Sequence, residues 1–173
     1  MAAKAGTARP IVRYGQAVLH RPCAPVTSFD AELAALVDDL FASMYAADGV
    51  GLAANQIGVG LRVFVYDCPE PAGTRQAGYV INPVLRIPAA LAPQVTEAEG
   101  CLSVPGQYAD LARPGVASVT GLDVRGREIS VAGTGVLARC LQHESDHLDG
   151  VVYVDLLPPA DRAAILAAVG LEA

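Results

Sequence analysis

The stretch Gln142-His143-Glu144-Ser145-Asp146-His147 says more about how this chain folds and acts than any other. Two histidines four residues apart project from one face of a helix, near enough to share one metal ion. Glu144 lies between them, where a carboxylate can reach water in an open coordination position. The pattern predicts a metal-assisted hydrolase, although matches to it also arise by chance.

The residues around this stretch predict a helix over about 134–149 that ends at Gly150. His143 and His147 fall within an apolar surface of this helix, made by Val136, Leu137, Cys140, Leu141 and Leu148. A helix with such a surface packs inside a protein. We therefore expect it to be mostly buried, with its histidines facing the core.

Short strand-like runs, separated by Pro and Gly, precede this helix. They cover residues 62–67, 78–87, 94–99, 117–123 and 128–131. Their close spacing favours antiparallel pairing over alternating βαβ units. The glycine-rich residues 49–58 are expected to form a loop.

Two further helices complete the expected fold. Apolar residues at spacings of three and four follow Thr27 or Ser28, either of which can cap a long helix that ends at Gly49. A short C-terminal helix is expected over residues 160–169. The predicted fold class is α+β, with antiparallel β-sheets packed around a central metal-binding helix, a long N-terminal helix and a short C-terminal helix.

Length and charge indicate a single soluble domain. The 173 residues suit one domain over 1–173, of which residues 1–10 are expected to be flexible. No apolar run approaches the roughly 18 residues that span a bilayer. The net charge of −6 argues against a general nucleic-acid surface, which needs a basic stripe. Neither a membrane nor a nucleic acid is an expected partner.

The four cysteines form no CxxC pair and follow no secretory signal. They are Cys23, Cys68, Cys101 and Cys140. In a reducing compartment such cysteines are free thiols or metal ligands. The expected location is therefore the bacterial cytoplasm, and an organelle form is not expected.

Two histidines alone do not make a catalytic site, because three protein ligands and one open position are typical. His20 lies in a proline-rich arm and is expected to be structural. No histidine follows His147, and the acidic residues that follow are poorly placed: Asp149, Asp155, Asp161 and Glu172. The downstream ligand that is usual in zinc peptidases of this motif is therefore missing.

The segment Glu99-Gly100-Cys101-Leu102-Ser103-Val104-Pro105 offers a better third ligand. Gly100 and Pro105 punctuate it, which places Cys101 at a strand end where a turn can present its sulfur. A thiolate with two imidazoles suits Fe(II), Zn(II) and similar borderline metals. The alternative is that Cys101 is one more small buried hydrophobic residue.

The chain resembles the peptide deformylases, which remove the N-formyl group from the initiator methionine of new proteins. Three motifs match in order and spacing: Gly49-Val50-Gly51-Leu52-Ala53-Ala54-Asn55-Gln56, Glu99-Gly100-Cys101-Leu102-Ser103 and Gln142-His143-Glu144-Ser145-Asp146-His147. The resemblance runs from about Ile11 to Leu157. The first motif alone is weak, since glycine-rich loops are common, but the three together are specific.

The resemblance implies that Cys101, His143 and His147 hold one divalent metal ion. This ion is Fe2+ in many members, and Zn2+, Ni2+ or Co2+ can replace it. The sequence does not rank these metals, because the same ligands bind each of them.

The resemblance also implies that Glu144 is the proton shuttle, and that the Gln56 side-chain N–H and the Leu102 backbone N–H form the oxyanion hole. A metal lowers the pKa of bound water and so provides a nucleophile near neutral pH. The two N–H groups can stabilise charge on the formyl oxygen, and loss of one such donor typically costs about 3 kcal/mol. Glu144 takes the proton from water and returns it to the leaving amine, with release of formate.

By the same resemblance, an N-formylmethionyl peptide or nascent chain binds as an extra strand beside the glycine-rich loop. Gly49 and Gly51 let a peptide approach the loop backbone closely. The residues expected to contact substrate are Val50, Gly51, Gly100, Val136, Arg139 and Cys140. Arg139 stands where some members have an aliphatic residue, which leaves the polarity of the methionine pocket open.

Asp146 is expected to anchor a cation behind the metal helix, and Arg113 is the suggested partner. Glu99 is either a support for the site or a surface residue of a strand. Residues 160–173 contain no basic run. Docking on the ribosome through a basic C-terminal helix is therefore not expected, and a transient ribosome association of another kind stays open.

Three functions remain open on the sequence. A deformylase fits all three motifs. A different HExxH metallopeptidase is the second, and the missing downstream ligand argues against it. A catalytically inactive, peptide-binding relative is the third, and the presence of Glu144, Gln56 and Cys101 argues against that.

Overall fold

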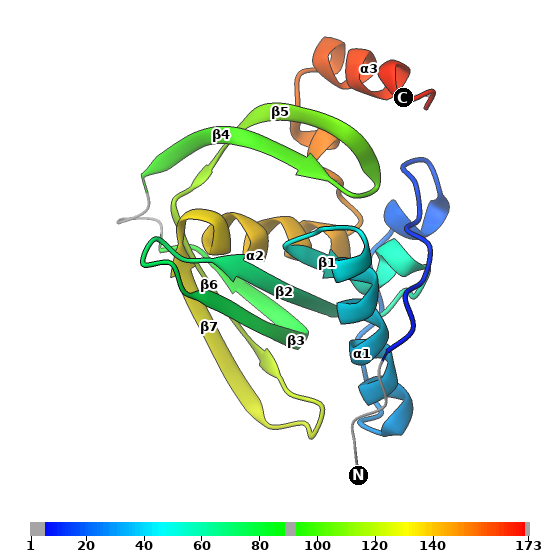
Figure 1. Cartoon of the computed structure of the whole chain (residues 1–173), viewed down its shortest axis with the longest axis vertical. Coiled ribbons are helices and arrows are strands. Elements are labelled where there is room, and N and C mark those ends of the chain that lie inside the picture. The colour runs from blue at the N-terminus through cyan, green and yellow to red at the C-terminus, as the bar shows by residue number, and fades with distance from the viewer. Residues whose placement is uncertain (1–5, 89–92, 172–173) are drawn as a thin grey trace.

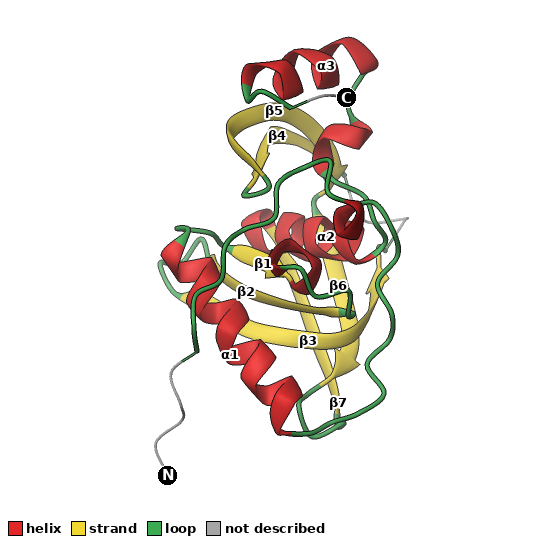
Figure 2. Ribbon diagram, turned by 90° about the vertical axis from the view of Figure 1, so that its right-hand side faces the viewer, coloured by secondary structure: helices red, strands yellow, loops and turns green. Residues whose placement is uncertain are grey.

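The computed structural model describes residues 6–88 and 93–171. Its helices are α1 (Ala31–Ala46), α2 (Gly135–Leu148) and α3 (Pro159–Ala168). Within these ranges no helix is long and apolar enough to cross a membrane. Helix α2 lies between a five-stranded sheet and a two-stranded sheet, and α1 runs beside the larger sheet (Figure 1, Figure 2). The mixed fold with antiparallel sheets confirms the predicted class.

Every strand pair in the two sheets is antiparallel. The larger sheet has the order β1-β2-β3-β6-β7, with bounds Gly51–Ala53, Val63–Pro69, Arg75–Arg86, Val116–Leu122 and Glu128–Thr134. The smaller sheet is a hairpin of β4 (Gln94–Cys101) and β5 (Val104–Pro114). Cys101 is the last residue of β4 and pairs with Val104 across the turn. This cysteine therefore lies at a strand end, as the sequence suggested.

Helix α2 packs its apolar side on the larger sheet. This core includes Leu137, Leu141 and Leu148 from the helix with Ala53, Phe64, Val80 and Val119 from the sheet. His143, Glu144 and His147 on the same helix are buried as well. The chain turns away from the helix at Gly150, whose φ of +82° favours glycine. A Cβ at this position would also stand 2.7 Å from the backbone nitrogen of Arg21.

Helix α1 begins later than the sequence suggested. The carboxylate of Asp30 accepts hydrogen bonds from the backbone N–H groups of Glu32 at 3.1 Å and Leu33 at 3.0 Å. Asp30 thereby satisfies two of the N–H groups that a helix start leaves without partners. The expectation that Thr27 or Ser28 caps the helix was therefore wrong.

Two pieces of regular structure were not expected. Residues 49–58, predicted as a loop, contain β1 and a 3₁₀ turn over Ala54–Ile57. Strand β5 contains Pro105, Gly106 and Pro114, residue types that disfavour strands, yet it pairs with β4. In β1 and β5 the backbone hydrogen bonds to the neighbouring strand outweigh the low strand propensity of these residues.

The N-terminal arm runs along α1. Of residues 1–10, which were expected to be flexible, 1–5 lie outside the described residues. The backbone N–H of Thr7 donates to Asp39 at 2.7 Å, and the Arg9 guanidinium forms an ion pair with the same carboxylate at 2.6 Å. The arm is thus attached to the outer side of α1 from Thr7 onward.

Replacement of Asp30 by alanine should destabilise the protein by about 1 kcal/mol, because two N–H groups at the start of α1 lose their acceptor. Urea unfolding followed by circular dichroism measures this change. Ser28→Ala is the matched control and should change the free energy of unfolding by less than about 0.5 kcal/mol. Equal losses in the two variants would contradict the assignment of Asp30 as the cap.

Candidate active site

Three candidate metal ligands meet between α2 and the hairpin. The Nε2 atoms of His143 and His147 lie 3.1 Å apart, and the Cys101 Sγ lies 3.2 Å from the Nε2 of His147. All three ligand atoms lie within 4.8 Å of one another. The histidines come from successive turns of α2, whereas the cysteine comes from the end of β4. The structure thus brings together the three residues that the sequence suggested as ligands.

This donor set fits one divalent metal ion. Metal bonds of about 2.0–2.1 Å to nitrogen and about 2.3 Å to sulfur place tetrahedral ligand atoms roughly 3.3–3.6 Å apart. The observed separations of 3.1 and 3.2 Å are close to these values. Two imidazoles with a thiolate suit iron or zinc. The residues present therefore fit the kind of metal that the sequence predicts.

Glu99 connects the candidate ligand His143 to two arginines. Its Oε1 lies 2.7 Å from the Nδ1 of His143 and accepts from the Nη2 of Arg113 at 2.6 Å. Its Oε2 accepts from the Nε of Arg113 at 2.7 Å and from the Nη1 of Arg139 at 2.8 Å. Burial alone would raise the pKa of Glu99, but hydrogen bonds with Arg113 and His143 outweigh it and hold that pKa well below its usual range. The ionised carboxylate keeps a proton on Nδ1 of His143, which leaves Nε2 for a metal.

Arg113 also joins the hairpin to α2. Its Nη1 donates to the Oδ2 of Asp146 at 2.9 Å, which is the pairing that the sequence suggested. The side chains of Arg113 and Glu99 are 8% and 3% exposed, so this part of the network is shielded from water. Arg113 therefore neutralises a carboxylate on β4 and one on α2 at the same time.

Glu144 is buried beside the candidate ligands, and its Oε2 has no hydrogen-bond partner in the part of the chain that the structure describes. Burial raises the pKa of Glu144 to about 7; the charge of His143 lowers it, whereas Glu99 raises it. A nearby divalent cation would favour the ionised form. A carboxylate with its pKa near neutrality can both accept and return a proton.

A hydrogen bond within its own turn orients the Gln56 side chain toward the candidate ligand Cys101. Its Oε1 accepts from the backbone N–H of Ala53 at 3.0 Å. Its Nε2 then lies 3.5 Å from the Sγ of Cys101 and 3.2 Å from the Oγ of Ser103. Leu102 lies between these last two residues, in the turn of the hairpin. The residues expected to supply the two oxyanion donors therefore flank the same sulfur.

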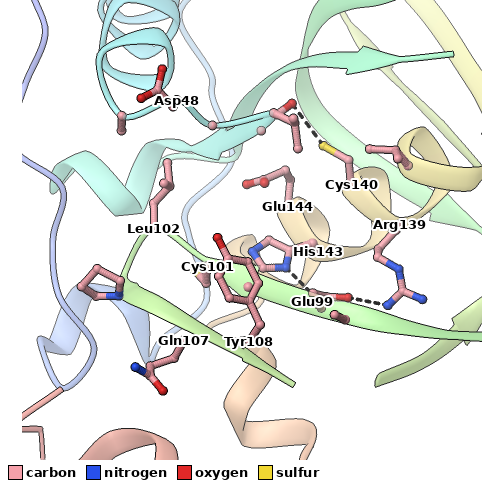
Figure 3. A pocket seen from close by; sticks show the side chains of 18 of the residues that line it. Asp48, Glu99, Cys101, Leu102, Gln107, Tyr108, Arg139, Cys140, His143 and Glu144 are labelled. Carbon is pink, nitrogen blue, oxygen red and sulfur yellow. Dashed lines mark hydrogen bonds and ion pairs between the residues drawn. The ribbon is translucent and has the colours of Figure 1, made fainter. Parts of the chain in front are cut away.

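A cavity of about 580 Å³ opens beside these groups. Figure 3 shows Glu144 near its centre, with Leu102 on one side and Arg139 on the other. All the residues expected to contact substrate line this cavity: Val50, Gly51, Gly100, Val136, Arg139 and Cys140. Arg113 and Asp146 are not part of the lining, in keeping with a supporting position.

The guanidinium of Arg139 is bound by the hairpin. Besides Glu99, it donates to the carbonyls of Leu111 at 3.0 Å and Val95 at 2.9 Å (Figure 3 shows the Glu99 contact). Its charge is therefore compensated inside the protein. The aliphatic stem is left to set the polarity of the cavity wall.

Three residues near the site were not singled out from the sequence. Asn55 donates to the backbone of His147, Ser103 accepts from Gln56, and Tyr108, which is 71% exposed, lines the cavity. Asn55 and Ser103 are polar residues inside two of the matched motifs, and this position could have indicated from the sequence that they lie near the site. Tyr108 lies on β5, a strand that the sequence did not reveal.

Comparison with known proteins gives a consistent answer. A family model described as polypeptide deformylase matches residues 8–163. Peptide deformylase 1 of Streptomyces avermitilis is 57% identical over 158 residues, which covers 91% of this chain and 73% of that one. The crystal structure of the Ehrlichia chaffeensis peptide deformylase in complex with actinonin is 38% identical, with a TM-score of 0.86, and covers 94% of this chain and 96% of that chain.

The chain belongs to the polypeptide deformylase family. Deformylases remove the N-formyl group from nascent peptides, so this chain is a metallohydrolase that acts on an amide. The predicted deformylase function is thereby confirmed. Peptide deformylase 2 of Streptomyces coelicolor, 55% identical over 152 residues, covers 88% of this chain and 84% of that one, so the similarity extends beyond the three motifs.

Arg113→Ala should destabilise this deformylase by about 3 kcal/mol, because it leaves the buried Glu99 with one arginine fewer. It should also weaken metal binding by about 10- to 100-fold, since Glu99 then orients His143 less well. Urea unfolding and competition with a chelator measure the two effects. Arg127→Ala, which removes an exposed guanidinium from its ion pair with Asp123, is the matched control and should cost less than about 1 kcal/mol. Unchanged metal affinity in Arg113→Ala would show that the ion pairs of Arg113 with Glu99 and Asp146 have no role in metal binding.

Gly51→Ala should lower kcat/KM about 10²-fold, because displacement of a catalytic group by about 1 Å costs that much. The added Cβ would stand 2.6 Å from the Sγ of Cys140 and nearer still to the carboxylate of Glu144. Steady-state formate release measures the loss. At Gly60 a Cβ would meet nothing within 4 Å, so Gly60→Ala is the control and should retain activity. Full activity in both variants would contradict the close approach.

Proposed function

We propose that Cys101, His143 and His147 hold one divalent metal ion, Fe2+ in the native enzyme, and that Glu144, Gln56 and Leu102 carry out deformylation. The observation that supports this most is the convergence of one sulfur and two imidazole nitrogens within 4.8 Å, beside a buried glutamate. Zn2+, Ni2+ or Co2+ would occupy the same ligands. In this proposal α2 is the metal-binding helix at the centre of a single domain over residues 1–173.

Glu144 moves the proton in this reaction. A metal ion, when bound, lowers the pKa of water so that hydroxide is available near neutral pH. Glu144 accepts the proton of the attacking water at its unpaired Oε2 and then delivers it to the nitrogen of the leaving amine. The C–N bond of the formamide breaks, and formate and the free amino terminus are the products.

Gln56 and Leu102 stabilise the negative charge that develops on the formyl oxygen. The Nε2 of Gln56 carries two N–H groups and is fixed because its Oε1 is held by Ala53. The backbone N–H of Leu102 follows the cysteine ligand in the hairpin turn. Donors that are held before the reaction need no reorganisation when charge develops, which is why such groups accelerate acyl transfer.

The substrate in this proposal is an N-formylmethionyl peptide or nascent chain that binds beside β1. Among the described residues, strand β1 pairs only with β2 and so is an edge of the larger sheet, able to accept a further strand. Val50, Gly51 and Gly100 would face the peptide backbone. Val136, Arg139 and Cys140 would enclose the methionine side chain. The Ehrlichia chaffeensis relative binds actinonin, and we propose that the same cavity binds it here.

We further propose that the enzyme works in the bacterial cytoplasm, on chains that are still being made. Helix α3 carries Asp161 and Arg162 and no basic run, so a transient contact with the ribosome would use another surface. Nascent chains are the expected substrate because the formyl group is carried by the initiator methionine of newly made chains.

The test uses anaerobically purified protein loaded with Fe2+ and mixed with formyl-Met-Ala-Ser or its unformylated counterpart. Formate release from the first peptide alone is expected. Glu144→Gln should reduce kcat by about 10²- to 10⁴-fold while metal content stays the same, because general acid–base catalysis is lost. Glu128→Gln, on the exposed start of β7, is the matched control. Peptide-bond cleavage would point to a metallopeptidase instead, and binding without turnover to an inactive relative.

A further inference from the structure

Asn55 is a buried polar residue that the proposed chemistry does not use. It lies in the 3₁₀ turn directly before Gln56, and its side chain is 0% exposed. Its Nδ2 donates to the backbone carbonyl of His147 at 2.6 Å, across 92 residues of sequence. A carbonyl oxygen can only accept, so this bond fixes the orientation of the Asn55 amide.

The carbonyl that Asn55 binds lies in the last turn of α2. Carbonyl groups there have no partner within the helix. The backbone N–H of Gly150 also donates to this oxygen, at 3.1 Å. Asn55 therefore fastens the end of the helix at the residue that carries a candidate metal ligand.

The turn that carries Asn55 is itself tied to the other parts of the site. Gln56 contacts Cys101 and Ser103 through its Nε2, and its backbone carbonyl accepts from Val12 at 2.8 Å. The same short turn thus places Gln56 beside Cys101 and, through Asn55, binds the backbone of His147.

Two buried polar atoms without partners lie on the same pair of residues. They are the Oδ1 of Asn55 and the Nδ1 of His147, which lack hydrogen bonds in the part of the chain that the structure describes. A metal-binding histidine usually donates its second ring N–H to an acceptor. Glu99 is the acceptor for His143. For His147, Asn55 binds the backbone carbonyl and not the ring.

We propose that Asn55 is a positioning residue that holds His147 in register with Gln56, so that a metal ligand and the oxyanion donor are fixed as one unit. This inference rests on the proposed function, in which His147 binds the metal. Asn55 does not line the cavity, so no direct contact with substrate is expected. Its loss should therefore affect metal retention and kcat more than KM.

The test compares Asn55→Ala with the unsubstituted protein loaded with Zn2+. Removal of partners behind a ligand typically costs about 10- to 100-fold in metal affinity, so metal transfer to a chelator should be faster by about that factor. With formyl-Met-Ala-Ser, kcat should fall while KM changes by less than about twofold, as expected when ground-state binding is intact. The absorption spectrum of the Co2+ form should also shift, because it reports the ligand geometry.

Asn82→Ala is the matched control. Asn82 is a partly buried asparagine whose side chain also bonds to the backbone, with the N–H of Val26 at 2.8 Å and its carbonyl at 2.9 Å, but it lies away from the cavity. It should lower the thermal unfolding temperature without changing chelator transfer or the Co2+ spectrum. Asn55→Leu, which fills the space without hydrogen bonds, serves as a second variant should the alanine variant fold poorly.

The outcomes separate the inference from the function on which it rests. If the unsubstituted protein retains metal and Asn55→Ala loses it no faster than Asn82→Ala does, Asn55 is only structural and the inference is overturned. If the unsubstituted protein binds no metal, the proposed function itself fails. Faster metal loss in both Asn55 variants and not in the control supports the inference.

Discussion

The buried carboxylate of Glu99 is the group on which the rest of this structure depends. It accepts hydrogen bonds from Arg113 and Arg139 and lies 2.7 Å from the Nδ1 of His143. It thereby binds the hairpin of β4 and β5 to α2, although the two belong to different layers. A carboxylate in this place is stable only because cationic partners compensate its burial. The same contacts orient the candidate ligand His143, so folding and the geometry of the proposed metal site are coupled through one side chain.

Two glutamates near the candidate metal ligands have opposite pKa shifts. Glu99 is hydrogen-bonded to Arg113 and His143, and these contacts hold its pKa well below the usual range despite its burial. Within the described residues the Oε2 of Glu144 has no hydrogen-bond partner, and burial raises the pKa of Glu144 to about 7. Environment alone therefore separates a carboxylate that stays ionised from one that can exchange a proton. Of the two, only the second suits the proton transfer that deformylation requires.

Much of the fold and site could be inferred from local sequence pattern. Helix α2, the end of that helix at Gly150, and the positions of five strands follow from periodicity and from Gly and Pro. Strand β5 and the cap at Asp30 could not be found this way. Strand β5 exists because β4 pairs with it, and Asp30 was one of several polar residues able to accept the same N–H groups.

The sequence by itself determined the kind of chemistry, because residues four apart on a helix have a fixed geometry and three motifs identified the family. Only the tertiary structure decided which distant groups meet. Glu99 reaches His143 across 44 residues, and Asn55 reaches His147 across 92. Which side chain lies beside which ligand depends on how the hairpin and the 3₁₀ turn pack against α2. Such long-range packing has no local periodicity in the sequence by which it can be recognised.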